Sequence, residues 1–352
     1  MTASTNKTQA GGSGREPALV DLALQGGGAH GAYTWGVLDR LLDESWLTYE
    51  GISGTSAGAM NAVVMAHGMV KGGPRQAQLE LESFWKKISE AALLSPFRRG
   101  PLEILTGQWT LDYCPAFVAA DMAARLLSPY TLSIGGGNPL YDILVDCVDF
   151  SAINNAGPKL FVTATNVRTG RGRVFRNAEM TPEVLLASAC LPTMFQAVEI
   201  DGDPYWDGGF AGNPTITPLV RECESPDTIL VSINPIERPG TPRTPMEIQN
   251  RLNEISFNSP LVKELRMAAL LRQVADPGSG EGAKWAKLRI HRVAGEDALL
   301  GLGFSSKSLA EWAFFCMLRE EGRRAAEVFL ETHGNDIGVR STLDIDLLIG
   351  ES

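Results

Sequence analysis

Short apolar runs alternate with amphipathic stretches in the N-terminal part of the chain. Residues 18–24 are apolar apart from Asp21, which predicts a buried strand, and residues 33–43 have the spacing of an amphipathic helix. Residues 47–53 predict a second strand, and 57–66 a second helix built from small residues. This repeated strand, loop and helix order is typical of an α/β fold with a mostly parallel sheet.

The middle of the chain departs from this order. Residues 77–140 contain a predicted helix at 79–88, followed by several prolines and a run of three glycines. Apolar groups such as Leu93, Leu94 and Phe97 lie between them. We interpret 77–140 as a helical insertion with loops, which could line or cover an apolar substrate site.

Regular alternation returns after the insertion. The pattern predicts strands at 159–167, 173–175 and 228–233, a helix at 182–190, and a hairpin that joins 198–200 to 205–206 through Asp201-Gly202. Asp-Gly between two short apolar runs is a strong hairpin signal. The order of elements therefore continues the α/β pattern.

Four prolines at 235, 239, 242 and 245 mark a boundary. Beyond them, 246–273 and 308–330 predict long helices. We expect 18–235 to form the main domain and 236–352 a mainly helical C-terminal extension packed on it. Residues 1–17 are polar and contain no apolar segment, which predicts a disordered tail and not a signal peptide.

Composition restricts the classes of function. The 352 residues carry a formal net charge of −10, which argues against nucleic-acid partners and against strong electrostatic adhesion to anionic lipid. The five cysteines are dispersed and form no metal-type cluster with the four histidines, which favours reduced thiols and a cytoplasmic location. No apolar run approaches the roughly 18 residues of a membrane-spanning helix. The sequence indicates no cofactor and no metal, and it does not reveal an oligomeric state.

The motif Gly54-Thr55-Ser56-Ala57-Gly58 connects the second predicted strand to the second predicted helix. Gly-x-Ser-x-Gly in this context predicts a nucleophile elbow, with Ser56 on a strained turn and glycines where side chains would collide with backbone. The first amides of the helix then face the position where negative charge develops. By itself, the pentapeptide is also compatible with a turn of small residues that has no chemistry.

A glycine-rich loop at 25–31 follows the first predicted strand. Gly26, Gly27 and Gly28 expose backbone amides at a helix start, so they are candidate donors to an oxyanion. The same loop also matches the dinucleotide fingerprint Gly-x-Gly-x-x-Gly, with Glu50 as the acidic residue. We favour the oxyanion interpretation, because the dinucleotide reading leaves the Ser56 motif unexplained.

No histidine is a convincing base for Ser56. His67 follows it by 11 residues, about 16 Å along a helix. His291 and His333 lie in no recognisable catalytic loop, and His30 belongs to the glycine-rich loop. Asp207, in Asp207-Gly208-Gly209 at a strand end, is better placed, since a poorly solvated carboxylate can take the serine proton directly. Viewed alone, this tripeptide also fits an ordinary turn.

Together these segments resemble the patatin-like phospholipase family. The resemblance is carried in order by residues 25–31, 54–58, 163–166, 187–195 and 207–209, and it covers about 18–235. It implies a three-layer α/β/α fold and a Ser-Asp dyad that works without metal. It further implies Ser56 as the nucleophile, Asp207 as the base, and the amides of Gly26, Gly27, Gly28 and Ala57 as the oxyanion hole.

The resemblance also implies a substrate class, the acyl esters of phospholipids, lysophospholipids or neutral lipids. One departure is His30, where many members carry Arg or Lys beside the glycines. A neutral imidazole would attract an anionic head group less strongly, which leaves a preference for phosphate open. Residues 251–258 resemble an extension found in some bacterial members, from which we infer no activity.

Three hypotheses follow. The leading one is a serine acyl hydrolase acting on lipid esters. Its rivals are a carboxylesterase or thioesterase for soluble acyl substrates and a non-catalytic lipid-binding regulatory protein, the last weakened by the presence of both dyad residues and all three glycines. Lipid substrates would require peripheral membrane contact, for which 93–99 and 261–273 are candidates. For 261–273, packing on the core is the stronger interpretation.

Overall fold

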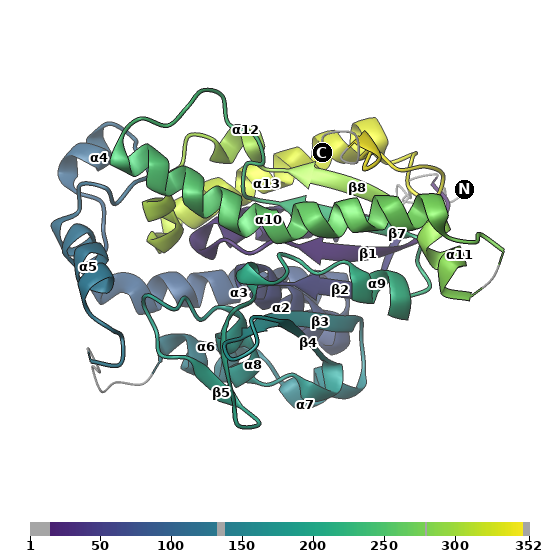
Figure 1. Cartoon of the computed structure of the whole chain (residues 1–352), viewed down its shortest axis with the longest axis horizontal. Helices are drawn as coiled ribbons and strands as arrows, with labels where there is room; N and C mark the ends of the chain where they lie inside the picture. Colours follow the sequence, from purple (N-terminus) through teal and green to yellow (C-terminus); the bar gives the residue numbers. More distant parts are fainter. Residues whose placement is uncertain (1–14, 132–137, 279, 348–352) are drawn as a thin grey trace, which may run out of the picture.

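The computed structural model describes residues 15–131, 138–278 and 280–347, and within these ranges the chain forms an eight-stranded sheet covered by helices on both faces (Figure 1). The strands are β1 (Ala18–Leu24), β2 (Leu47–Gly54), β3 (Lys159–Asn166), β4 (Gly172–Arg176), β5 (Val198–Ile200), β6 (Asp203–Asp207), β7 (Asp227–Ser232) and β8 (Arg289–Ala294).

The helices of the N-terminal part are α1 (Gly31–Leu41), α2 (Ala57–Gly72), α3 (Pro74–Ala91), α4 (Pro101–Leu105), α5 (Pro115–Leu126), α6 (Pro139–Cys147) and α7 (Phe150–Asn155). They are followed by α8 (Pro182–Ser188), α9 (Thr217–Glu222), α10 (Pro245–Val274), α11 (Gly280–Lys287), α12 (Glu296–Leu299) and α13 (Trp312–His333). Short 3-10 helices are η1 (Gly28–His30), η2 (Ala92–Leu94), η3 (Asn177–Glu179), η4 (Gly208–Phe210) and η5 (Phe304–Ser308).

The sheet is mixed but mostly parallel. Its order is β5-β6-β3-β2-β1-β7-β8, with β4 also paired to β3. The pairs among β3, β2, β1, β7 and β8 are parallel, and those of β4, β5 and β6 are antiparallel. Because each parallel connection needs a crossover, helices cover both faces. The α/β fold predicted from the sequence is confirmed.

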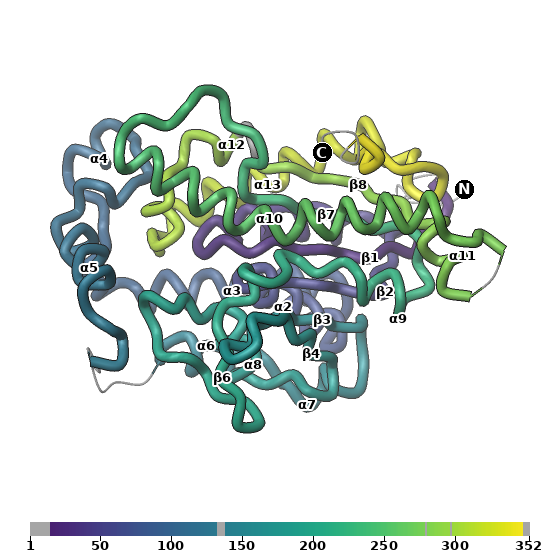
Figure 2. The backbone as a smooth tube through the Cα atoms, viewed as in Figure 1, coloured from purple at the N-terminus to yellow at the C-terminus, as the bar shows by residue number. Residues whose placement is uncertain are grey.

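Two apolar cores lie on opposite faces of the sheet. Leu22 and Leu24 of β1 belong to the larger core, with α1, α2, α3 and α13, whereas Ala23 of the same strand belongs to the smaller one, with α9, α10 and α11. This alternation follows from the two-residue period of a strand. Figure 2 shows the tube of α10 crossing in front of the sheet strands, with α2 and α3 behind.

One edge of β3 brings two distant segments together. Residues 159–162 of β3 pair with β2, and 164–166 pair with β6, while β4 pairs with 161–165. Since β4 spans both ranges, it occupies one edge of β3, and β2 and β6 must share the other. The end of β6, at Asp207, therefore lies beside the end of β2, from which the chain turns into Ser56.

Helices α1 and α13 cross at very short range. A Cβ atom added at Gly36 would lie 2.0 Å from the carbonyl oxygen of Arg319, and one at Gly322 would lie 2.1 Å from that of Tyr33. Only glycine allows the two backbones to approach this closely. The C-terminal helix α13 thereby packs directly on the first helix of the fold.

The predicted strands agree closely with the structure up to residue 235, whereas the helices α7 and α9 were not predicted. The Asp201-Gly202 hairpin is present, with φ of 54° and 81° at its two central residues. The pattern missed β8, which extends the sheet beside β7, so the C-terminal region adds a strand as well as helices. The predicted tail at 1–17 lies almost entirely outside the described residues.

Within the described residues of 77–140 the chain forms most of α3, then α4, α5 and the start of α6, joined by loops. Figure 1 draws α4 and α5 at the left end of the molecule, beyond the N-terminal part of α10. The insertion contacts the C-terminal region, since Arg99 pairs with Glu311 at 2.7 Å and the Leu111 amide donates to Ser305 Oγ at 3.1 Å. No helix among the described residues combines the length and apolarity needed to cross a bilayer.

Candidate active site

Ser56 occupies the strained turn that its motif predicts. It has φ 54° and ψ −122°, a backbone conformation that non-glycine residues rarely adopt. Gly54 permits the turn, because a Cβ atom there would lie 2.5 Å from the carbonyl oxygen of Gly58. The Thr55 hydroxyl donates to the Gly212 carbonyl at 2.7 Å and anchors the turn. Ser56 therefore lies between β2 and the first turn of α2.

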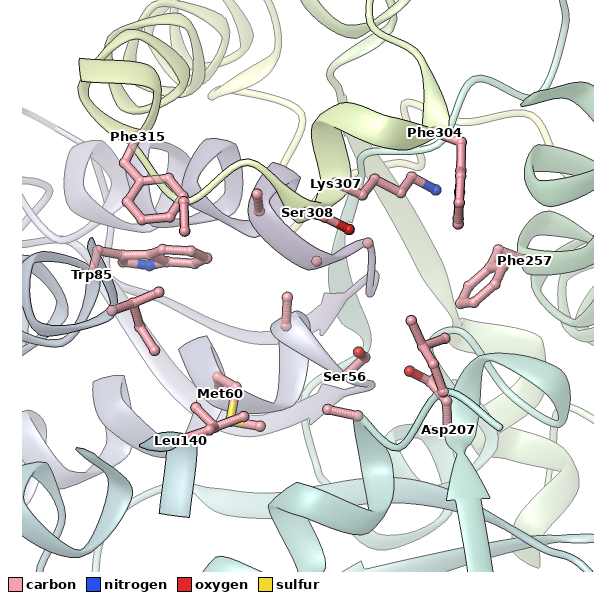
Figure 3. A pocket seen from close by; sticks show the side chains of 18 of the residues that line it. Ser56, Met60, Trp85, Leu140, Asp207, Phe257, Phe304, Lys307, Ser308 and Phe315 are labelled. Atoms are coloured by element: carbon pink, nitrogen blue, oxygen red, sulfur yellow. The ribbon is translucent and has the colours of Figure 1, made fainter. Parts of the chain in front are cut away.

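Asp207 ends β6 and lies on the same pocket as Ser56 (Figure 3). Its Oδ1 accepts the Gly209 amide at 2.7 Å, and its carbonyl oxygen accepts the Thr165 hydroxyl at 2.8 Å. Burial raises the pKa of Asp207 to about 6, although hydrogen bonds from Gly209 and Ser56 and the charge of Lys307 act in the opposite direction. The carboxyl is thus poised to bind or release a proton near neutral pH.

The three glycines of the predicted oxyanion loop have different environments. Gly27 and Gly28 line the pocket with Ala57, and Gly28 and Ala57 begin helices, whose first amides lack acceptors within the helix. Gly26 does not line the pocket. Its amide donates to Asn213 Oδ1 at 2.6 Å, so this N–H is already engaged.

Side-chain amides hold the glycine-rich loop in place. Gln25 Nε2 donates to Asn258 Oδ1 at 2.8 Å, and Gln25 Oε1 accepts the backbone amides of Ile233 and Asn234 at 2.8 and 2.9 Å. Asn234 Nδ2 donates to the Gly26 carbonyl at 2.9 Å. Because all of these groups are buried, each bond is costly to break and the loop is rigidly positioned.

The pocket, of about 250 Å³, is mainly apolar. It draws side chains from both halves of the chain, including Met60 of α2, Phe84, Trp85 and Ile88 of α3, Leu140 of α6, Phe257 of α10, Phe304 of η5 and Phe315 of α13. Four of these residues, Phe84, Trp85, Ile88 and Leu140, lie within 77–140, the segment interpreted above as an insertion. An alkyl chain fits such a lining.

Lys307 is a pocket residue that the sequence analysis missed. It lies in η5, and its Nζ donates to Asn234 Oδ1 at 2.7 Å and to Asn253 Oδ1 at 2.6 Å. Burial lowers the pKa of Lys307 to about 8. Its local sequence, Ser305-Ser306-Lys307-Ser308, has the composition of an ordinary polar loop, so no signal in the sequence distinguished it.

None of the four histidines lines this pocket. His30 Nε2 lies 2.7 Å from Ser306 Oγ, and burial lowers the pKa of His30 to about 3, which keeps the ring neutral. His291 is buried against Asp227 at 2.9 Å, His333 pairs with Asp336 at 3.1 Å, and His67 lies in a separate surface groove.

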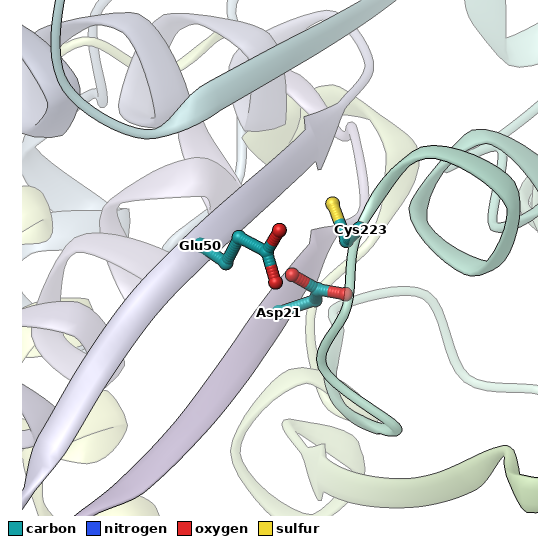
Figure 4. Close-up of side chains that lie close together, drawn as sticks. All are labelled: Asp21, Glu50 and Cys223. Carbon is teal, nitrogen blue, oxygen red and sulfur yellow. The ribbon is translucent and has the colours of Figure 1, made fainter.

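One cluster outside the pocket has the residue types of a metal site. Asp21, Glu50 and Cys223 place their ligand atoms within 4.8 Å of one another (Figure 4). Glu50 is already engaged by Lys159 Nζ at 2.9 Å and by the amides of Glu224 and Ser225. Burial, with repulsion from Glu50, raises the pKa of Asp21 to about 8. Because Glu50 already binds a lysine and two backbone amides, and Asp21 already accepts the Gly51 amide, the cluster has the bonding of a buried polar network.

The family model described as patatin-like phospholipase matches residues 22–220. No curated protein matches the chain. Among solved structures, the chain is similar to VipD from Legionella pneumophila, with 16% identity over 93% of this chain and 70% of that chain and a TM-score of 0.38.

The match to residues 22–220 spans more than half of the chain and includes the glycine-rich loop at 25–31, the Ser56 motif and Asp207. The mixed, mostly parallel sheet between helical layers agrees with it. This chain belongs to the patatin-like phospholipase family, whose domain implies a lipid acyl hydrolase.

Proposed function

We propose that this protein is a serine acyl hydrolase that cleaves lipid acyl esters through a dyad of Ser56 and Asp207. The observation that carries the proposal is the pairing of a serine on a strained elbow with a buried carboxylate in one apolar pocket that no histidine lines. An aspartate with a pKa of about 6 is a competent base at neutral pH.

In the first half-reaction, Asp207 takes the proton of the Ser56 hydroxyl while Oγ attacks the ester carbonyl carbon. The resulting oxyanion accepts hydrogen bonds from the amides of Gly27, Gly28 and Ala57. The tetrahedral intermediate collapses, the C–O bond to the alcohol breaks, and the alcohol leaves with the proton from Asp207. Ser56 then carries the acyl group.

In the second half-reaction, Asp207 takes a proton from water as the water oxygen attacks the acyl carbon. The same amides bind the second oxyanion. The bond to Ser56 Oγ breaks, the proton returns to the serine, and a fatty acid is released. The dyad needs no metal for either step.

The proposed oxyanion hole has fewer backbone donors than the sequence predicts, because it does not include Gly26. The Gly26 amide is bonded to Asn213, so we assign Gly26 a positioning role. A Cβ atom at Gly26 would also lie 2.5 Å from the Thr55 carbonyl oxygen and 2.9 Å from Ser56 Cβ. The absence of a side chain at Gly26 thus allows the glycine-rich loop to contact the turn at Ser56.

Access to lipid is proposed through the insertion, in a cytoplasmic protein that binds membranes peripherally. Large apolar side chains are strongly exposed there, with Leu94 at 97%, Leu105 at 85% and Leu126 at 81%. By contrast, Leu261 and Leu265 of the second membrane candidate are buried in the smaller core. We therefore place the membrane contact on α4, α5 and their flanking loops.

Labelling with a fluorophosphonate probe tests the proposal. We expect labelling of the native protein, none in Ser56→Ala, and strong loss in Asp207→Asn. Ser308→Ala is the matched control, because Ser308 lines the same pocket and should leave labelling intact. If the folded protein is never labelled at Ser56, the proposed serine hydrolase function is wrong. Turnover of soluble acyl esters or thioesters without turnover of lipid esters would favour the carboxylesterase or thioesterase alternative.

A further inference from the structure

The pocket has two chemically different sides. In Figure 3, Met60, Trp85, Leu140 and Phe315 lie on one side of Ser56, and Lys307, Phe304, Phe257 and Asp207 lie on the other. An ester bound at Ser56 has an acyl side and an alcohol side. The apolar side of the pocket suits the acyl chain, so the alcohol part of the substrate faces Lys307.

Lys307 forms no ion pair among the described residues, although the carboxylates of Glu254 and Asp207 attract its charge through space. An ammonium group has three N–H donors, and two of them meet the neutral amide oxygens of Asn234 and Asn253. The nearby carboxylate of Glu254 is bound by Arg238 at 2.6 Å and by Arg251 at 3.1 Å. One donor of Lys307 therefore stays available to a ligand in the pocket.

Such an arrangement is costly unless a ligand uses it. Burying an ammonium group removes it from water, and two neutral amides replace only part of the lost hydration. The lowered pKa of about 8 reports this cost, yet it still leaves the group charged at pH 7. An anion in the pocket would supply the direct ion pair that neither Glu254 nor Asp207 forms with Lys307.

The residue beside the glycines cannot supply this charge. His30 is buried, bonded to Ser306 and neutral. Ser306 directly precedes Lys307 in η5. The 3-10 helix η5 therefore contacts the neutral His30 through Ser306 and also places the ammonium group of Lys307 at the pocket.

We propose that Lys307 selects esters that carry a phosphate group on the alcohol side of the scissile bond. The phosphate accepts the free N–H of Nζ, while the acyl chain occupies the side of the pocket formed by Trp85, Leu140 and Phe315. This assignment rests on the proposed hydrolase function and adds the substrate feature that the enzyme recognises. It makes Lys307 a specificity-determining residue.

The proposal also gives a role to residues 251–258. Asn253 binds Lys307, Phe257 lines the pocket, and Asn258 binds Gln25 of the glycine-rich loop. Phe257 also places its ring 5.3 Å from Lys307 Nζ. This segment of α10 builds the alcohol side of the pocket.

Two soluble esters that differ only in the phosphate test the assignment, 1-octanoylglycerol-3-phosphate and 1-octanoylglycerol. We expect the native enzyme to favour the phosphate ester in kcat/KM. Lys307→Met should lower the ratio of the two kcat/KM values by roughly 10- to 100-fold, the loss expected for one charged hydrogen bond. Lys307→Arg should retain part of the preference. Lys287→Met, an exposed lysine on α11, is the charge-matched control and should leave the ratio unaltered.

Equal losses on both esters in Lys307→Met, or native preference for the uncharged ester, would overturn the assignment while leaving the hydrolase intact. Inorganic phosphate is tested as an inhibitor of octanoylglycerol hydrolysis. Inhibition by phosphate at the concentration used for the phosphate ester would indicate a site for free anions and would contradict selection of the ester. Binding of both esters to Ser56→Ala, with and without Lys307→Met, is measured calorimetrically. The binding measurement tests whether Lys307 recognises the phosphate group even if no turnover occurs. Absence of both turnover and probe labelling would refute the proposed hydrolase function but not the binding preference.

Discussion

The hydroxyl of Ser188 accepts the backbone N–H of Ser56 at 2.9 Å and donates to the carbonyl of Thr163 at 2.7 Å. A single fully buried hydroxyl thus joins the elbow to the central strand β3. Ser188 ends α8, within the 187–195 segment on which part of the family resemblance rests. Its position connects that segment to the candidate site, because the Ser188 hydroxyl fixes the backbone of Ser56, the proposed nucleophile.

Ser188→Ala should therefore impair both stability and catalysis. It leaves a buried donor and a buried acceptor without partners, which should lower the free energy of unfolding by about 2–3 kcal/mol. A displaced Ser56 should lower kcat by roughly 10- to 100-fold with a smaller change in KM. Urea unfolding and octanoate ester kinetics measure the two effects, and Ser151→Ala, at an exposed position, is the control. An unaltered kcat would mean that Ser188 only packs the interior.

The pH dependence of hydrolysis should reflect Asp207. The base must be ionised, and its pKa is raised to about 6, so kcat/KM should fall as the pH drops through about 6. An unperturbed aspartate would retain activity to about pH 4. Lys307→Met should move this acidic limb to higher pH, because the Lys307 cation lowers the pKa of Asp207. If the acidic side of the pH profile does not shift in this variant, the charge of Lys307 does not influence the pKa of the base.

Asp207→Asn should abolish turnover and yet stabilise the fold above neutral pH. The folded-state pKa of Asp207 lies above its unfolded value of 3.8, so ionisation disfavours the folded state. The associated loss of stability develops between pH 4 and 6 and amounts to about 3 kcal/mol. Chemical unfolding at pH 4 and pH 8 should therefore show a gain in the variant only at pH 8. Equal effects at both values would contradict a raised pKa.

Gly322→Ala tests the crossing of α1 and α13. The added methyl group would meet the Tyr33 carbonyl oxygen at 2.1 Å, so the helices must separate, at a cost of at least about 2 kcal/mol. Gly301→Ala is a suitable control, because nothing lies within 4 Å of a Cβ atom at that position. Thermal unfolding of the two variants should differ by several degrees.

The exposed leucines of the insertion should matter only at a lipid surface. Replacing Leu94, Leu105 and Leu126 by serine removes apolar area from a face that contacts solvent, so folding should be little affected. Hydrolysis of phospholipid vesicles should fall by about tenfold or more, whereas hydrolysis of a monomeric octanoate ester should change little. Equal losses on both substrates would place these side chains in the interior of the site instead.

Local chemistry made much of the fold predictable. The elbow and the Asp201-Gly202 hairpin follow from glycine and turn preferences within a few residues, and the structure contains both. The strand β8 escaped prediction because Arg289, His291 and Arg292 break its apolar pattern. Arg289 and His291 are instead bonded to Asp227 on β7, a partner more than 60 residues away.

The candidate site was predictable where one segment carries its own signal. Ser56 and Asp207 stand in glycine motifs, but their meeting depends on β2 and β6 sharing one edge of β3, which no local pattern encodes. Lys307 stands in no motif, and the resemblance of 251–258 indicated no role for Asn253, since the contact of these two residues arises from the packing of η5 against α10. The engagement of the Gly26 amide by Asn213 is a tertiary contact of the same kind.

The addition of β8 to the sheet bears on how this protein can be dissected. A fragment that stopped at the end of the family match, residue 220, would lose β7 and β8 and leave β1 as a bare, apolar sheet edge. Such edges recruit other chains, so we expect that fragment to precipitate. It would also lack Lys307, Asn253 and Phe257, and with them one wall of the pocket. The smallest piece worth expressing therefore extends through α13, well past the boundary that homology alone would suggest.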